Sequence, residues 1–269
     1  MHLQHARSLL FLPASNARAV EKARSLDCDM VILDLEDAVP DDMKGQARAA
    51  LEPAFSSGFG ERIGAVRVNA TDSPHHAEDI AALQGVATDI VILPKVETAE
   101  QAAALYRALN KPVIAMIESP LGVAHAPAIA GAEGVVGLFM GNNDLRHDLR
   151  IPMDADRTGL MLAMQSVILA ARLHGKAVFD GVYNRLDDAE GFASECREGR
   201  GLGFDGKTLI HPNQIVPANA IFGPSEAELA EARALIGAAT GGAERFDGKM
   251  IEAMHVAQAK ALLVRAGEL

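Results

Sequence analysis

The chain has 269 residues, of which 49% are hydrophobic and 23% are charged, which is the composition of a globular protein with a sizeable core. Its formal net charge is −11 and only 4% of its residues are aromatic, so it lacks the basic surface that nonspecific nucleic-acid binding requires. The apolar runs are shorter than the roughly 20 residues that cross a bilayer, and the N-terminus does not resemble a signal peptide. Cys28 and Cys196 are expected to be free thiols, so we expect a cytoplasmic protein.

Eight apolar runs recur along the chain, and stretches typical of amphipathic helices separate them. Several runs are continuously apolar, which indicates parallel strands buried on both faces. The predicted strands are 8–12, 30–35, 64–68, 89–93, 113–117, 135–140, 176–180 and 205–210. The predicted helices are 16–26, 43–54, 75–84, 98–109, 122–131, 156–174 and 187–200.

This alternation predicts an α/β fold, a (β/α)8 TIM barrel. The alternative is a doubly wound open sheet, whose dinucleotide-binding form carries a glycine-rich loop after the first strand, where this chain reads LPASNARA. The end of the chain is typical of a separate helical extension, with Ser225 and Glu228 spaced as a capping box. We expect a catalytic barrel over 1–222 and a C-terminal helical extension or lid over 223–269.

Charged and amide side chains follow the predicted strands, at the end of a TIM barrel where catalysis takes place. In chain order they are Asp34, Glu36, Asp37, Arg67, Asn69, Lys95, Glu97, Glu118, Asn142, Asn143, Asp144, Asp180 and His211. Glu118 closes the fifth strand and Asp144 follows the sixth, and two carboxylates on adjacent strands suit a hard cation such as Mg²⁺. The sequence has no His-x₃-His pair, which argues against a zinc site.

Each of these residues also has an interpretation that involves no chemistry. Glu118 could cap the helix that follows it, and Arg67 could simply neutralise the acids after the second strand. Lys95 could be a Schiff-base lysine, but a salt bridge to Glu36 or Glu97 is the interpretation that we favour. The functional interpretation gains weight because so many of these groups fall on one rim.

Most of these residues lie within longer sequence motifs. The motifs are RSLLFLPASNARAVEKA, VILDLEDAVPDDMKGQAR, RVNA, ILPKVET, MIESPLGV, GNNDL, GFDGKTLIHPNQI and GKMIEAMHVAQA. Together they resemble the citrate lyase beta-subunit and malyl-CoA lyase family of class II, metal-dependent CoA-ester lyases and 2-oxo-acid aldolases, nearly from end to end. The combination of LDLEDAV with a following K-x-x-A-R is specific to this family.

The resemblance implies a carbon–carbon lyase that uses Mg²⁺, or Mn²⁺ in its place. Such an enzyme cleaves a 3-hydroxyacyl-CoA, such as citryl-CoA or malyl-CoA, into an acyl-CoA and a 2-oxo acid. By resemblance, Glu118 and Asp144 bind the metal, Arg67 binds the carboxylate of the 2-oxo acid, and Asp37 lies near the metal and its waters. The positions expected to contact coenzyme A are Phe11, Pro13, Arg18 and Lys22.

Two positions depart from the family pattern. Relatives often carry Arg where this chain has Asn16, and the nearby Arg18 could supply the contact to the phosphates of CoA. The tail motif of relatives commonly ends in Asp, supplied to the active site, whereas this chain has Glu252. Glu is one methylene longer, and a misplacement near 1 Å can cost on the order of 100-fold in rate. We take Glu252 as the candidate base.

Three other functions stay open from the sequence. They are a thioesterase or malate-synthase-like activity on the same site, a 2-oxo-acid aldolase that does not use CoA, and a non-catalytic accessory subunit. Glu118, Asp144 and Arg67 argue against the accessory subunit, whereas Asn16 and Glu252 argue for it. The expected partners are a CoA thioester, a 2-oxo acid and further copies of the chain. The resemblance implies a trimer or hexamer in which the C-terminal segment can close over a neighbouring site.

Overall fold

The computed structural model describes residues 2–152, 154–240 and 242–269. The chain forms two compact units, one that runs to Asn219 and one from Ala220 to Leu269. Within the described ranges, every helix is too short or too polar to cross a membrane.

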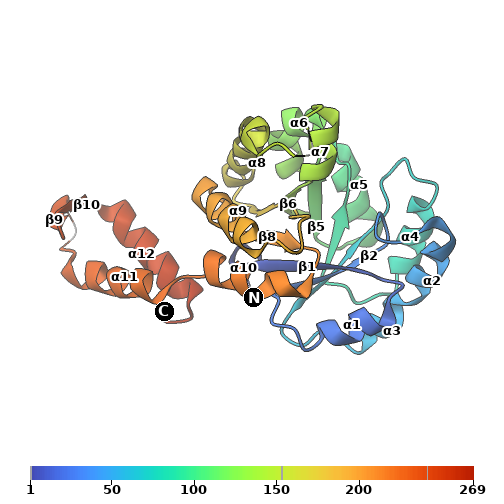
Figure 1. Ribbon diagram of the computed structural model, residues 1–269, viewed down its shortest axis with the longest axis horizontal. Coiled ribbons are helices and arrows are strands. Elements are labelled where there is room, and N and C mark those ends of the chain that lie inside the picture. Colours follow the sequence, from blue (N-terminus) through green and yellow to red (C-terminus); the bar gives the residue numbers. More distant parts are fainter. Residues whose placement is uncertain (1, 153, 241) are drawn as a thin grey trace. The chain divides into compact units, whose positions relative to one another are not determined.

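The first unit is a closed barrel of eight parallel strands that follow one another around the ring, with β8 pairing back to β1 (Figure 1). The strands are β1 (Ser8–Pro13), β2 (Met30–Asp34), β3 (Ile63–Arg67), β4 (Ile90–Leu93), β5 (Val113–Ile117), β6 (Val135–Met140), β7 (Ala177–Asp180) and β8 (Gly206–Leu209). Each strand begins and ends within one residue of its predicted bounds. The prediction of a (β/α)8 TIM barrel is confirmed.

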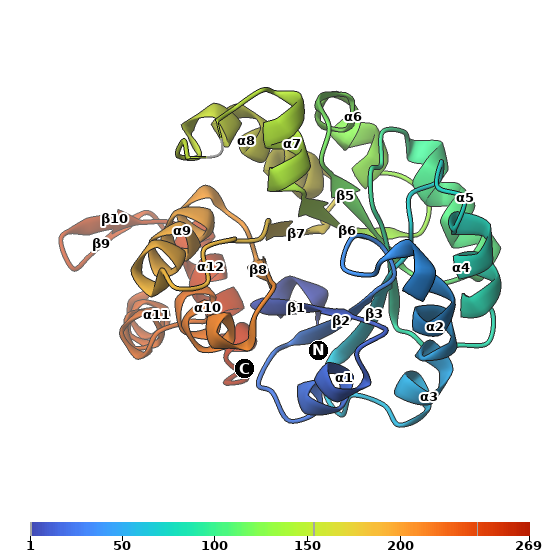
Figure 2. The same ribbon diagram turned by 45° about the vertical axis from the view of Figure 1, so that its right-hand side comes forward.

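Helices surround the ring of strands (Figure 2). They are α1 (Ala17–Ala23), α2 (Lys44–Ala49), α3 (Leu51–Ser56), α4 (His76–Leu83), α5 (Ala99–Leu109), α6 (Pro120–Ala130), α7 (Asn142–Asp148), α8 (Met161–Leu173), α9 (Ala189–Leu202) and α10 (Ile215–Phe222). One predicted helix needs correction, and one helix was not predicted. The single helix predicted over 43–54 is two helices, because the chain breaks at Ala50 and Pro53 lies in the first turn of α3, where no backbone donor is needed. The segment GNNDL, which follows the sixth strand, begins the helix α7.

Aliphatic and aromatic side chains fill the interior of the barrel. The cluster contains Leu9, Met30, Ile32, Ala65, Ile90, Ile92, Ile114, Met116, Phe139, Ala177 and Phe179. The ring of Phe139 lies edge-on to Phe179 at 5.4 Å and to Phe11 at 6.3 Å between centroids.

Side-chain alternation explains which polar residues face the mouth of the barrel. Side chains two residues apart in a strand point to the same side. Ile32 lies in the interior cluster, so Asp34 points the same way at the end of β2. The same spacing places Arg67 and Glu118 after interior residues of β3 and β5. Charged side chains thus continue the interior rows where the strands end.

The second unit consists of two helices and a hairpin: α11 (Glu226–Ala238), β9 (Glu244–Phe246), β10 (Lys249–Ile251) and α12 (Ala253–Arg265). Ser225 and Glu228 form the predicted capping box, in which Ser225 Oγ accepts from the Glu228 amide and the Glu228 carboxylate accepts from the Ser225 amide at 2.8 Å. RFDGK contains the hairpin turn: Asp247 and Gly248 both have positive φ, as a tight hairpin turn requires. The two short strands beside it were not predicted.

Candidate active site

A pocket of about 320 Å³ opens at the carboxyl ends of the barrel strands. Its volume lies at the lower end of the range typical of small-molecule sites. Its lining brings together Phe11, Asp37, Arg67, Glu118 and Asp144, all of which the sequence singled out. Asp34, Asn142, Asn143, Asn184 and Thr208 contribute further polar groups to the same wall. Part of the predicted rim of functional groups therefore forms one cavity, whereas the lining does not include Glu36, Asn69, Lys95, Glu97, Asp180 and His211.

Arg67 is held by the acids that follow β2. Asp34, its neighbour across the β2–β3 pair, accepts hydrogen bonds from Nε at 2.7 Å and from Nη2 at 2.6 Å. Nη1 lies 2.9 Å from a carboxylate oxygen of Glu36 and 3.8 Å from one of Asp37. The guanidinium also lies 4.8 Å above the ring of Phe11. One edge of Arg67 is thus committed to Asp34, and a ligand carboxylate would have to reach Nη1 beside or in place of Glu36.

The charges around Arg67 shift the pKa values of the cluster. Burial alone would lower the pKa of Arg67, but the charge and hydrogen bonds of Asp34, together with the charges of Glu36 and Asp37, outweigh burial and raise this pKa. Burial raises the pKa of Glu36 to about 7, although the charge of Arg67 opposes the shift. Glu36 is only 5% exposed, so the ionised form of its carboxyl group needs nearby cations to stabilise it.

Glu118 is buried at the end of β5, and burial raises the pKa of its carboxyl to about 8. The charges of Glu36 and Asp144 add to this shift. One oxygen, Oε1, accepts a hydrogen bond of 2.6 Å from the backbone N–H of Lys95. A Cβ atom at Gly141 would lie 2.2 Å from Cβ of Glu118, so only glycine lets the end of β6 pass beside this carboxylate.

Lys95 reaches Glu118 through an unusual backbone conformation. Its φ of 52° lies in the left-handed region, which costs a non-glycine residue roughly 1–2 kcal/mol. The conformation aims its N–H at Glu118, while its Nζ lies 3.4 Å from Glu36. The favoured interpretation of Lys95 as a salt-bridge partner of an acid is confirmed for Glu36.

The donor set fits Mg²⁺. Mg²⁺ is usually bound through one or two carboxylates and keeps several waters or substrate oxygens. Glu118 and Asp144 are two such carboxylates, and a cation beside them would offset the burial and the repulsion that together raise the pKa of Glu118. In the part of the chain that the structure describes, no three or more His, Cys, Asp or Glu side chains are grouped to enclose a metal by themselves. A site completed by water and substrate therefore suits these residues.

The residues expected to contact coenzyme A lie at and beside the first strand. Phe11 lines the pocket and Pro13 is the last residue of β1. Arg18 and Lys22 are exposed on α1, outside the pocket lining. Asn16 caps α1, because its side-chain oxygen accepts a hydrogen bond of 3.1 Å from the amide of Ala19. The departure from the family pattern at this position thus has a local structural role, and the contacts to CoA stay predictions.

Glu252 belongs to the second unit, where it occupies the N-cap position of α12. Its backbone N–H donates to Nδ1 of His255 at 3.0 Å, and its side chain is exposed. Its role as a base stays a prediction.

Asp180 does not belong to the rim, although its place at the end of β7 put it there in the sequence. Phe179 faces the interior, so Asp180 points outward and is fully buried. It accepts hydrogen bonds from Nζ of Lys207 at 2.9 Å and from Nη1 of Arg157 at 2.8 Å. Burial would raise the pKa of Asp180, but Lys207 and Arg157 lower it. The network is a structural crosslink that sequence reasoning missed.

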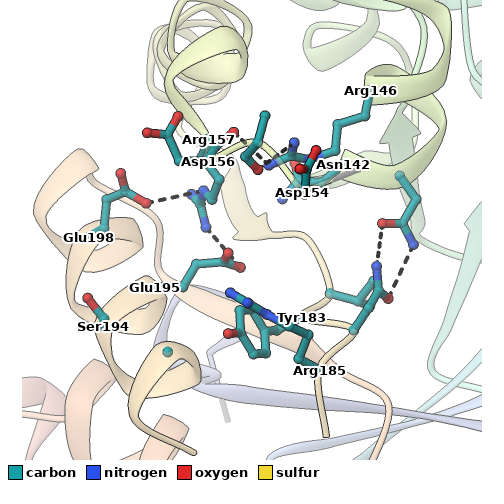
Figure 3. Close-up of a pocket in the computed structure, with 15 residues that line it drawn as sticks. Asn142, Arg146, Asp154, Asp156, Arg157, Tyr183, Arg185, Ser194, Glu195 and Glu198 are labelled. Carbon is teal, nitrogen blue, oxygen red and sulfur yellow. Dashed lines mark hydrogen bonds and ion pairs between the residues drawn. The ribbon is translucent and has the colours of Figure 1, made fainter. Parts of the chain in front are cut away.

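A second hollow of about 740 Å³ lies beside the pocket and shares Asn142, Asn143, Val182 and Asn184 with it. Figure 3 shows Arg157 between Glu195 and Glu198 in this hollow. Asn184 donates to the side chain of Asn143 at 2.7 Å, so this amide pair forms part of the wall between the two spaces. Nothing in the spacing of GNNDL indicated this pair.

Comparison with known proteins identifies the family. The family model HpcH/HpaI aldolase/citrate lyase matches residues 7–212. The chain is 41% identical to a (3S)-malyl-CoA thioesterase of Cereibacter sphaeroides, over 97% of this chain and 94% of that protein. It is 36% identical to a citrate lyase subunit beta-like protein of Deinococcus radiodurans, over 96% of each chain.

A solved structure agrees with these sequence matches. The protein CitE of Mycobacterium tuberculosis, in complex with magnesium, acetoacetate and coenzyme A, is similar with a TM-score of 0.86 and 34% identity. The match covers 99% of this chain and 100% of that one. The chain therefore belongs to the HpcH/HpaI aldolase/citrate lyase family.

Proposed function

We propose that the protein is a Mg²⁺-dependent carbon–carbon lyase that cleaves a 3-hydroxyacyl-CoA of the malyl-CoA or citryl-CoA type into an acyl-CoA and a 2-oxo acid. The observation that carries the proposal is the convergence of Glu118, Asp144 and Arg67 on one pocket at the mouth of the barrel. A similar structure binds magnesium, coenzyme A and a small oxo acid together, which supports the same combination of ligands here.

The reaction sets three requirements. The hydroxyl proton must leave, the carboxylate next to it must be oriented, and the departing carbon must be stabilised as a thioester enolate. When bound, Mg²⁺ supplies Lewis-acid stabilisation of the negative charge that develops on oxygen. The residues that would hold it are Glu118 and Asp144.

The other roles fall to side chains of this chain. Nη1 of Arg67, which Asp34 does not engage, would bind the substrate carboxylate through charge-assisted hydrogen bonds, in competition with Glu36. Asp37, at the exposed edge of the pocket, would orient the waters of the site. Glu252 would remove the hydroxyl proton of the substrate. It belongs to a C-terminal segment that would close over the site of a neighbouring copy in a trimer or hexamer.

A thioesterase is the second candidate, because the chain is 41% identical to a (3S)-malyl-CoA thioesterase. Hydrolysis would use the same pocket, with water attacking the thioester carbonyl, and it would leave the carbon skeleton intact. The two reactions differ in which bond breaks, so their products distinguish them.

The test is an incubation with (3S)-malyl-CoA and, separately, with citryl-CoA, each with Mg²⁺ and with a chelator. A lyase releases a 2-oxo acid, trapped as its phenylhydrazone, in equal amount to acetyl-CoA and releases no free thiol. A thioesterase releases the free thiol of CoA and no 2-oxo acid. Absence of both products, or equal rates with the chelator, would reject the Mg²⁺-dependent enzyme.

A further inference from the structure

We propose that Lys44 is a positioning residue that fixes the arginine–carboxylate part of the site by tying the turn after β2 to the turn after β3. The inference rests on the proposed function, since it assigns Lys44 a role in binding the substrate carboxylate through Arg67. Lys44 is the first residue of α2 and is 5% exposed. It lies outside the lining of the 320 Å³ pocket, so it would act only through other residues.

The ammonium group of Lys44 makes three short hydrogen bonds. Nζ donates to the backbone carbonyl of Leu35 at 2.8 Å, to that of Glu36 at 2.9 Å and to Oδ1 of Asn69 at 2.8 Å. An ammonium has three N–H donors, so its hydrogen-bonding capacity is fully used. None of the three acceptors is a carboxylate, although a buried cation is normally paired with one. The arrangement is therefore a crosslink between turns rather than a salt bridge.

The two turns that Lys44 joins carry the groups that orient Arg67. Leu35 and Glu36 directly follow Asp34, the bidentate partner of Arg67, and Asn69 lies two residues after Arg67. The backbone supports the same junction, because the amide of Leu35 donates to the carbonyl of Arg67 at 2.9 Å. Lys44 thus fixes the main chain on both sides of the ion pair.

The network continues through Asp79 to Arg48, a second residue of α2. Asp79 accepts two hydrogen bonds from Asn69, from its backbone N–H at 2.8 Å and from its side-chain amide at 2.6 Å. The other oxygen of Asp79 accepts from Nη1 of Arg48 at 3.2 Å. Lys44 and Arg48 are four residues apart in α2 and so lie on one face of the helix. They are the Lys and Arg of K-x-x-A-R, which gives this motif a physical link to LDLED and RVNA.

Removal of the ammonium would take the donor from Oδ1 of Asn69 and one of two donors from each carbonyl, since Leu35 also accepts from Nδ2 of Asn69 and Glu36 from the amide of Val39. The turn after β2 would shift or admit water, and Glu36, whose carboxylate lies 2.9 Å from Nη1 of Arg67, would shift with it. A displacement near 1 Å in a binding group costs on the order of 100-fold. The proposed metal ligands, Glu118 directly after β5 and Asp144 in α7, belong to other segments than the two turns, so Mg²⁺ binding should persist.

The experiment uses Lys44→Met, which keeps an unbranched side chain and removes all three donors. Its matched control is Lys111→Met, because Nζ of Lys111 also donates to a backbone carbonyl, that of Thr88 at 3.2 Å, at the opposite ends of the strands. Calorimetry measures the binding of Mg²⁺, and then of oxaloacetate to the Mg²⁺-loaded protein. Lys44→Met is expected to bind Mg²⁺ as the parent does and oxaloacetate about 10- to 100-fold more weakly, whereas Lys111→Met matches the parent in both.

Asn69→Ala keeps the bonds of Lys44 to Leu35 and Glu36 but removes both side-chain links to the turn after β3, that of Lys44 to Oδ1 of Asn69 and that of Nδ2 of Asn69 to the Leu35 carbonyl. This variant is the test of the crosslink if Lys44→Met fails to fold. It should also weaken the binding of oxaloacetate. Parent-like oxaloacetate binding by the folded variants, with only a lower free energy of unfolding, would overturn the positioning role. If the parent binds Mg²⁺ but not oxaloacetate, the proposed function fails and the inference falls with it, a result distinct from a failure of Lys44 alone.

Discussion

Asp34 and Arg67 lie opposite each other on β2 and β3, and the carboxylate of Asp34 accepts two hydrogen bonds of 2.7 and 2.6 Å from the guanidinium of Arg67. Asp34 is fully buried and Arg67 nearly so. The pair fixes the plane of the guanidinium and occupies Nε and Nη2, so a substrate carboxylate would have to reach Nη1, which faces Glu36 at 2.9 Å. Arg67 therefore neutralises the acids after β2 and, in our proposal, also binds the substrate carboxylate.

Arg67→Lys should lower kcat/KM toward malyl-CoA by about 100-fold, because a lysine cannot reproduce the planar two-point contact with Asp34 or the stacking on Phe11. Mg²⁺ affinity should not change. The matched control is Arg172→Lys, since Arg172 also makes a two-point contact, with Asp205, outside the pocket lining. Equal kcat/KM for Arg67→Lys and the parent would leave Arg67 with a purely structural role.

Glu118→Gln should weaken Mg²⁺ binding by at least about 100-fold, because it removes a charged ligand and even outer-shell changes cost 10–100-fold. The metal-free variant should be as stable as the parent or more stable, since burial already disfavours the ionised form of Glu118. Titration calorimetry and thermal unfolding measure the two effects. Glu97→Gln is the control, because Glu97 accepts a hydrogen bond from Ser119 nearby but does not line the pocket. Unchanged Mg²⁺ affinity in Glu118→Gln would remove Glu118 from the ligand set.

The raised pKa of Glu118 predicts how the stability of the metal-free protein depends on pH. The folded protein holds the proton of the Glu118 carboxyl more tightly than the unfolded chain does. The resulting stabilisation of the folded state is fully present below pH about 4.5 and is lost as the pH rises through about 8. Thermal unfolding in a chelator should therefore show a Tm that falls across this window. Saturating Mg²⁺ should remove most of the fall, because the cation favours the ionised form. If Tm falls equally steeply with pH in the presence and absence of Mg²⁺, the pH dependence does not come from Glu118.

Asp180→Asn should lower the free energy of unfolding by about 3–5 kcal/mol, because it leaves the buried Lys207 and Arg157 short of a counter-charge. Denaturant titration measures this loss. Glu21→Gln provides the comparison, since Glu21 pairs with Arg24 at the surface and such pairs contribute about 0–1 kcal/mol. A loss of activity in Asp180→Asn without a loss of stability would return Asp180 to the catalytic rim.

Glu252→Gln should lower turnover by about 100-fold or more if its carboxylate is the base, and it should leave Mg²⁺ affinity unchanged. The second measurement mixes Glu252→Gln chains with Arg67→Lys chains. Recovery of activity on mixing is expected if the tail of one copy completes the site of another. Full turnover in Glu252→Gln alone would reject the base assignment.

The barrel and the composition of its mouth could be predicted from sequence, because eight apolar runs with polar residues at their ends allow few other folds. Periodicity also placed Glu118 and Arg67 together, since each ends a strand. It could not orient Asp180, because β7 is uniformly apolar up to that residue and its alternation is invisible. The left-handed backbone of Lys95 carries no compositional signal either, as glycine or asparagine would have done. These features depend on contacts between loops that only the closed barrel brings together.

The most direct test of the account is the rate at which glyoxylate forms from (3S)-malyl-CoA in the presence of Mg²⁺, measured for the parent and for Asp144→Asn. The account predicts that the parent releases glyoxylate and acetyl-CoA in equal amounts. It also predicts that Asp144→Asn, which keeps the shape of the side chain and removes the ligand charge, loses most of this activity and regains part of it at high Mg²⁺. Malyl-CoA that stays intact with the Mg²⁺-loaded parent, or cleavage that Asp144→Asn leaves unchanged, would contradict it.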